Sequence, residues 1–209
     1  MKSKLKVIMV LVLLPLFFNA AAVHASEVTD ILKATIDGAF KVLNDPSLKG
    51  PEKEALKREK LRAAIKKTLD FAEMSKRSLA RHWLKRTDAE RKEFVALFSD
   101  LLENSYMDKI EMNSDAKVRY YGERKAGNKV EVKTNVLTRK GLVVPINYRL
   151  MKKGGVWVVY DIVIEGVSLV SNYRTQFNKI IRQSSYEDLV KGLKEKAVNR
   201  SASNDKPGP

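Results

Sequence analysis

The spacing of apolar residues in the first half of the chain is that of amphipathic helices. Residues 26–44 place an apolar residue every three or four positions, with charged residues between them. A second helix is predicted to begin at Pro51, because proline is favoured in the first helical turn, and a short one follows Asp70, which can cap it. Thr87 and Glu90 have the spacing of a capping box, so the apolar stripe after them predicts the clearest helix of the chain.

The hydrophobic pattern changes from the helical period to strict alternation at Lys117. Alternating runs near residues 118–121, 130–136 and 144–150 predict strands, and glycine-containing turns separate them. A fourth run, residues 156–164, is almost entirely β-branched or aromatic, which predicts a strand buried on both faces. Short turns between successive strands favour an antiparallel meander.

Helical spacing returns after the last strand. Gly166 breaks the strand pattern, and Ser168 can cap a helix whose apolar residues continue to Ile181. Ser185 and Asp188 can start a final helix.

The predicted fold is therefore α+β, with a four-stranded antiparallel sheet covered by helices on one face. Such a sheet can leave an apolar cavity between itself and the helical layer. We expect one domain over residues 26–200 and a short polar tail, residues 201–209, that is disordered.

Residues 1–25 have the three parts of a secretory signal peptide. Lysines precede an apolar run, and Val23 and Ala25 provide small residues before a cleavage position. The alternative is an uncleaved membrane anchor, but Pro15 interrupts the run, which is shorter than the ~20 apolar residues of a spanning helix. We expect cleavage after Ala25 and an exported mature protein.

The chain is strongly basic, with a formal net charge of +15 over 209 residues. An exported protein rarely meets nucleic acid, so an anionic membrane surface or an anionic ligand is the favoured partner. Residues 49–92 hold 15 Lys/Arg and 7 Asp/Glu, which is either a solvated helical face or a surface that docks on anionic lipid or an acidic protein. The chain has no cysteine, so packing and not disulfides must stabilise it.

Few residues could support catalysis or bind a metal. His82 is the only histidine after residue 25, and without cysteine a structural zinc site is not expected. His82 lies among cationic residues, which favours a packing role at a helix end over a role as general base.

Asp161 and Glu165 are candidates for an acid/base pair, because they lie four residues apart and point to the same face of the predicted strand. Their Cα atoms would lie ~13 Å apart along one strand, whereas glycosidase carboxylates lie ~5–9.5 Å apart. Pairing with arginines such as Arg149, Arg174 or Arg182 is therefore favoured, because a buried carboxylate is usually matched by a cation. We expect no enzymatic activity.

Apolar side chains are abundant in both predicted layers. By default they form a core, and some of them can also surround a cavity for an apolar ligand. The sheet is expected to contribute Val132, Val136, Ile146, Tyr148, Trp157, Val159 and Ile162. The helices are expected to contribute Phe71, Met74, Phe94, Phe98, Leu101, Val170, Tyr173 and Phe177.

Two motifs carry a family resemblance. The first is FAEM at residues 71–74 with RHW at residues 81–83, followed by Phe94, Phe98, Leu102 and Tyr106. The second is longer and more specific: WVVYDIVIEGVSLV at residues 157–170, followed by NYR at residues 172–174 and QF at residues 176–177. Together they resemble the MlaC family of periplasmic phospholipid-binding proteins of Gram-negative bacteria, also described as toluene-tolerance auxiliary components of an ABC transporter.

The resemblance implies a soluble, monomeric shuttle for glycerophospholipid. It would exchange lipid with an inner-membrane ABC transporter, through its membrane-anchored substrate-binding subunit, and with an outer-membrane lipoprotein–porin complex, and so maintain outer-membrane lipid asymmetry. The phospholipid would be cargo, with no other cofactor. Such a carrier removes a large barrier, because at ~0.8 kcal/mol per CH₂ two acyl chains cost roughly 20 kcal/mol to expose to water.

The resemblance also extends the expected site. It adds Trp83, Leu102 and Tyr106 to the apolar residues above as lipid-binding residues, and it suggests that Arg81, Arg149 and Arg174 contact the head group or partner proteins. Two alternatives remain open: an isomerase or dehydratase with an Asp161-centred pocket on a cone-shaped α+β fold, and an interaction module with a solid core.

Overall fold

The computed structural model describes residues 26–204, with side chains described as far as Ala197. The predicted signal peptide lies outside the described residues, as do the last five residues of the predicted tail. The α-helices are α1 (Glu27–Leu43), α2 (Glu54–Lys66), α3 (Phe71–Leu79), α4 (Asp88–Met112), α5 (Leu169–Gln183) and α6 (Tyr186–Asn204). Short 3₁₀ helices are η1 (Pro46–Leu48), η2 (Pro51–Lys53) and η3 (Ala80–Lys85).

The strands form one antiparallel sheet in chain order, as predicted. They are β1 (Lys117–Ala126), β2 (Lys129–Leu137), β3 (Val143–Lys153), β4 (Val156–Ile164) and β5 (Val167–Ser168). The prediction of four strands was wrong, because the sheet has five. Glu165 and Gly166 have positive φ angles of 49° and 83°, which turn the chain tightly enough for β5 to pair with β4.

Most predicted helix starts are confirmed by their capping bonds. The side chain of Asp70 accepts from the backbone N–H of Glu73 at 2.9 Å. Thr87 and Glu90 form the complete capping box ahead of α4. The Ser168 hydroxyl accepts from the backbone N–H of Ser171 at 3.0 Å and so caps α5. At Pro51 the chain first forms η2, and α2 begins only at Glu54.

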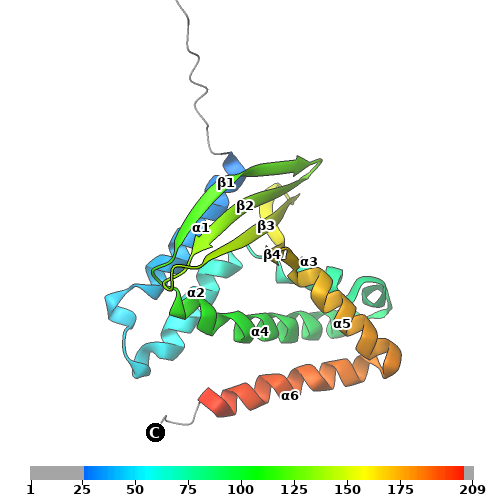
Figure 1. The fold of residues 1–209 in the computed structure, drawn as a ribbon. Helices are drawn as coiled ribbons and strands as arrows, with labels where there is room; N and C mark the ends of the chain where they lie inside the picture. The colour runs from blue at the N-terminus through cyan, green and yellow to red at the C-terminus, as the bar shows by residue number, and fades with distance from the viewer. Residues whose placement is uncertain (1–25, 205–209) are drawn as a thin grey trace, which may run out of the picture.

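The buried side chains form two clusters. The sheet cluster joins α1 to the sheet and contains Val28, Leu32, Val130, Val132, Leu150 and Val159. The helical cluster joins α3, α4, α5 and α6 and contains Phe71, Met74, Leu79, Phe94, Phe98, Leu102, Val170, Phe177, Tyr186, Leu189, Val190 and Leu193. In Figure 1, α1 lies behind the sheet, α4 runs below it and α6 lies below α4.

The link between α2 and α3 holds these two clusters together. Leu69 packs against both of them. On either side of Leu69, the N–H of Val159 donates to the carbonyl of Thr68 at 2.8 Å, and the N–H of Asp70 donates to the carbonyl of Val159 at 3.0 Å. This short parallel bridge closes the edge of β4 that β5 leaves uncovered.

Helix α2 is attached differently from the other helices. Leu61 is its only buried residue, and ion pairs connect it to α4. Arg58 pairs with Asp108 and Glu111, each at 3.2 Å, and Arg62 pairs with Glu103 at 2.5 Å. Within residues 26–204, no helix combines the length and apolar character needed to cross a membrane.

Candidate functional site

The strand register gathers the seven predicted sheet residues on one face of the sheet, which we call the apolar face. Val132 lies opposite Tyr148, and Tyr148 lies opposite Ile162. Residues directly opposite each other, or two positions apart, share a face, so Val136 and Ile146 belong to it too. A bulge between Arg149 and Leu150 in the β3–β4 pairing shifts the register, which brings Val159 and Trp157 to the same face.

Burial divides these seven residues into two groups. Val132 and Val159 are 0% exposed and pack against Val28 and Leu32 of α1, so they fill the sheet cluster. The other five keep part of their side-chain surface accessible: Val136, Ile146, Tyr148, Trp157 and Ile162. These half-buried residues are the ones free to contact a ligand.

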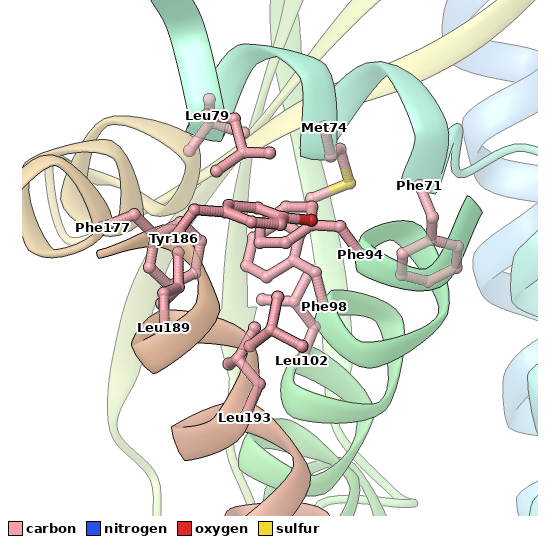
Figure 2. Packing of buried hydrophobic residues seen from close by; sticks show 12 residues of the cluster. Phe71, Met74, Leu79, Phe94, Phe98, Leu102, Phe177, Tyr186, Leu189 and Leu193 are labelled. Atoms are coloured by element: carbon pink, nitrogen blue, oxygen red, sulfur yellow. The ribbon is translucent and has the colours of Figure 1, made fainter. Parts of the chain in front are cut away.

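The helical candidates divide in the same way. Seven are buried in the helical cluster: Phe71, Met74, Phe94, Phe98, Leu102, Val170 and Phe177. Trp83, Leu101, Tyr106 and Tyr173 are half-buried at its margin. Figure 2 shows the buried side chains meeting one another and side chains of α6, including Tyr186 and Leu189.

Aromatic contacts make the helical cluster a solid core. The ring of Phe98 meets those of Phe177 and Tyr173 edge-on, with centroids 5.4 and 5.1 Å apart. Phe94 stacks on Phe98 at 5.9 Å and meets Phe177 edge-on at 5.6 Å. The buried aromatic residues of the sequence motifs therefore hold the helices together.

Tyrosines occupy half-buried apolar positions in both layers. Burial raises the pKa of Tyr148 to about 12. Burial, with a smaller contribution from Tyr173, raises the pKa of Tyr106, and burial beside Tyr148 raises that of Tyr120. These hydroxyls therefore stay protonated at neutral pH and can donate a hydrogen bond from an apolar wall.

Two buried polar atoms near the apolar face lack a partner within the described part of the chain. They are the hydroxyl of Tyr120 and Nε1 of Trp157, and both residues pack against the sheet cluster. Unpaired buried donors are uncommon and often mark the place of a ligand or water. Tyr120 was not among the predicted site residues, although its alternation with Val118 could have placed it on this face.

Two pockets among the described residues are partly open to solvent, and neither is the predicted cavity. One, of about 260 Å³, lies between α4 and α6 and is lined by Leu101, Asn104, Ser105, Leu193, Lys196 and Ala197. The other, of about 170 Å³, lies at β1–β4 and is lined by Arg124, Ala126, Lys129, Val130, Glu131, Arg149 and Tyr160. An enclosed space between the apolar face and the helical cluster is not shown.

Asp161 lies on the sheet face opposite the apolar face, and its carboxylate is fully engaged. It accepts hydrogen bonds from Arg149 Nη1 at 3.0 Å, from the Ser168 hydroxyl at 2.6 Å and from the backbone N–H of Val170 at 3.1 Å. The predicted pairing of Asp161 with Arg149 is confirmed. Glu165 is exposed in the β4–β5 turn, so the two carboxylates do not form a catalytic pair.

The three candidate arginines lie in two places. Arg149 also donates to Glu131 at 2.8 Å, and its attraction to both carboxylates raises its pKa above the ordinary value. Arg81 donates to Asn178 at 3.1 Å and Arg174 donates to the carbonyl of Arg77 at 2.9 Å, so both lie where α3 and η3 meet α5.

His82 also lies at this junction. Its Nε2 is 3.0 Å from the side-chain oxygen of Asn178 on α5, consistent with the packing role predicted for it. In the described residues, no group of three or more His, Asp or Glu side chains could hold a metal ion.

Comparison with known proteins identifies the family. The family model described as MlaC protein matches residues 33–195, which is most of the chain. The chain belongs to the MlaC family. The resemblance seen in the two motifs is therefore confirmed, and so is the expectation that the chain is not an enzyme, because this is a family of transport proteins.

Individual relatives agree with the MlaC assignment. The chain is 26% identical over 121 residues to the intermembrane phospholipid transport system binding protein MlaC of Haemophilus influenzae, a match that covers 55% of this chain and 56% of that protein. It is 25% identical to a phospholipid-binding protein from Ralstonia solanacearum, whose structure was solved in complex with a phospholipid. The two folds superpose with a TM-score of 0.75, over 83% of this chain and 98% of that one.

Proposed function

We propose that this protein is a periplasmic phospholipid carrier. It shuttles glycerophospholipid, as a monomer, between an inner-membrane ABC transporter with its membrane-anchored substrate-binding subunit and an outer-membrane lipoprotein–porin complex. This transport maintains the lipid asymmetry of the outer membrane. The observation that carries the proposal is the likeness, in both fold and family, to a protein solved with a phospholipid bound.

The cargo's acyl chains lie in a cavity between the apolar face and the helices, which opens when lipid enters. The half-buried residues contact them: Val136, Ile146, Tyr148, Trp157 and Ile162 from the sheet, and Trp83, Leu101, Tyr106 and Tyr173 from the helices. Two features support this assignment. These side chains keep accessible apolar surface in the folded protein. In addition, Trp157 and the neighbouring Tyr120 each have a buried donor without a partner among the described residues.

The remaining candidates have supporting roles. The fully buried members of the predicted set stabilise the two clusters that frame the cavity. Arg81 and Arg174 are exposed and can contact a head-group phosphate or an acidic partner. Arg149 can do so only in competition with Glu131 and Asp161.

Mass spectrometry of an organic extract of the purified protein tests the proposal. We expect phospholipid in near-stoichiometric amount. A protein that yields no lipid, and still yields none after incubation with liposomes, would refute the carrier function.

A substitution locates the cargo. Ile146→Glu places a carboxylate on the apolar face, and burying it against acyl chains without a partner is strongly unfavourable. We expect at least a tenfold loss of bound lipid. Asn147→Glu, the next residue of β3 on the opposite face, is the matched control and should keep its lipid. Circular dichroism should show both variants folded; equal lipid content in the two would place the cargo elsewhere.

A further inference from the structure

The turn between β2 and β3 exposes apolar side chains to solvent. We call residues 137–143 the hairpin tip. Leu137, Leu142 and Val143 are 39%, 62% and 58% exposed. Two hydrogen bonds fix the turn: the N–H of Thr138 donates to the carbonyl of Leu142 at 2.9 Å, and the N–H of Leu142 donates to the Thr138 hydroxyl at 3.1 Å. The exposure of Leu142 therefore belongs to an ordered turn.

The C-terminal end of α4 extends this apolar surface. Met112, the last residue of α4, is 62% exposed. Arg139 of the hairpin tip donates its backbone N–H to Asn113 Oδ1 at 3.4 Å, and its Nε lies 3.1 Å from both carboxylate oxygens of Asp115. These contacts fix the hairpin tip next to the end of α4 (Figure 1).

Cations surround the exposed apolar residues. Lys117 lies directly opposite Leu137 in the sheet, and Lys140 lies in the turn itself. Neither forms an ion pair within the described residues, whereas Asp115 is neutralised by Arg139 and Glu111 by Arg58. The net charge around the hairpin tip is therefore positive.

The apolar face ends beside the hairpin tip. Val136 lies opposite Val144 in the sheet, and the next pair along the strands is Leu137 with Val143. Val136 and Val144 belong to the apolar face, whereas Leu137 and Val143, one position further along each strand, lie on the opposite face, so the apolar face reaches the sheet end where the hairpin tip begins.

We propose that the hairpin tip docks the protein on an anionic phospholipid bilayer. Leu142 and Val143 enter the head-group region, while Lys117 and Lys140 face lipid phosphates. Apolar side chains flanked by cations are the combination that holds peripheral proteins at an anionic membrane surface. The inference rests on the proposed function, because both complexes with which the carrier would exchange lipid are embedded in phospholipid bilayers.

The shape of the hairpin tip favours a bilayer over a protein partner. Its exposed residues project from a turn, and the two pockets described above do not include a residue of the hairpin tip. Protein partners usually bury large aromatic or arginine anchors in a packed patch, whereas a few aliphatic residues on a projecting turn suit shallow insertion among lipid head groups.

A fluorescent label can test insertion directly, because the chain has no cysteine. Leu142→Cys provides a single attachment site for an environment-sensitive dye. Leu84→Cys is the matched control, because Leu84 is 78% exposed in η3, which precedes the N-terminal end of α4, whereas the hairpin tip lies at the C-terminal end. The 25 residues of α4 span about 37 Å at 1.5 Å per residue. With vesicles of phosphatidylcholine and phosphatidylglycerol, we expect a blue shift from the dye at position 142 and none at position 84.

Charge variants test the electrostatic part. In a vesicle co-sedimentation assay, Lys140→Gln should weaken binding to the same vesicles about fivefold, which corresponds to the roughly 1 kcal/mol that one cation contributes at an anionic surface. Lys85→Gln, next to Leu84, removes the same charge away from the hairpin tip and should leave binding unchanged. Vesicles of phosphatidylcholine alone should bind weakly.

The outcomes separate this inference from the carrier function. A protein that contains phospholipid but shows no dye shift, or the same shift at positions 142 and 84, refutes bilayer docking and leaves the carrier function intact; the hairpin tip would then suit an acidic protein surface. A protein that binds vesicles through the hairpin tip but never contains lipid refutes the carrier function instead.

Discussion

Replacing Asp161 by asparagine tests whether this carboxylate stabilises the corner between β4 and α5. Asp161 is 3% exposed and accepts hydrogen bonds from Arg149, the Ser168 hydroxyl and the Val170 backbone. Asparagine has nearly the same shape but only one acceptor oxygen, and its NH₂ group can only donate. If its oxygen accepts from Val170, its NH₂ group faces the guanidinium of Arg149, donor against donor.

The expected destabilisation follows from these contacts. A hydrogen bond to a charged group is worth about 1.5–3 kcal/mol. The Arg149 side chain is 36% exposed and keeps its ion pair with Glu131. Losing its hydrogen bond to Asp161 should therefore cost an amount at the lower end of that range. The Ser168 hydroxyl can rotate to accept from the new amide, so its contribution is mostly retained. We expect the free energy of unfolding to fall by about 1.5–2 kcal/mol and Tm by about 3–8 °C.

Thermal unfolding followed by circular dichroism measures this change. Glu165→Gln removes one carboxylate from the exposed β4–β5 turn and should change the free energy of unfolding by less than about 0.5 kcal/mol. Asp161→Asn should retain bound lipid, because the carboxylate lies opposite the apolar face. A loss of stability no greater than that of Glu165→Gln would refute the reasoning, and a loss of lipid with unchanged stability would contradict the structural role.

Two further predictions concern hydrogen bonds near α1. Burial opposes ionisation of Glu123, but hydrogen bonds from Ser26 and Thr29 outweigh it and lower its pKa below the ordinary 4.5. The ionised Glu123 carboxylate therefore stabilises the fold above about pH 4.5, and this contribution is lost as the pH falls through the folded-state pKa. Glu123→Gln should be less stable than the wild type at neutral pH, and the difference should shrink in acid. Unfolding measured at several pH values checks this. Tyr120→Phe removes an unpaired buried hydroxyl, so calorimetry should show the delipidated variant more stable by up to about 1 kcal/mol; an equal gain in the lipid-bound protein would mean that the hydroxyl does not contact cargo.

The capping residues made the helix starts predictable. Asp70, Thr87 and Ser168 each act within three residues of their own position, so their role can be deduced from local sequence. Strand β5 could not be predicted, because a strand of two residues is too short to show an alternating hydrophobic pattern. It exists because Glu165 and Gly166 reverse the chain, and a positive φ at glutamate is uncommon enough not to be expected.

Seven apolar residues of the sheet could be named from the sequence, but their position on one common face could not be predicted. Strict alternation would put Trp157 and Val159 on the face opposite Ile162. The bulge between Arg149 and Leu150 brings them together, and pairing irregularities of this kind depend on the partner strand. Likewise, Val159 and Ile162 look equivalent in sequence, and only the position of α1 makes one a core residue and the other half-buried.

Leu69 links the stability of the two hydrophobic clusters. Because its side chain packs in both hydrophobic clusters, and the backbone on either side of it is bonded to Val159, neither cluster can lose its structure without withdrawing contacts from the other. We therefore expect the sheet layer and the helical layer to unfold together in one transition. If cargo enters between the two layers as proposed, the segment around Leu69 is the hinge that stays folded while they part.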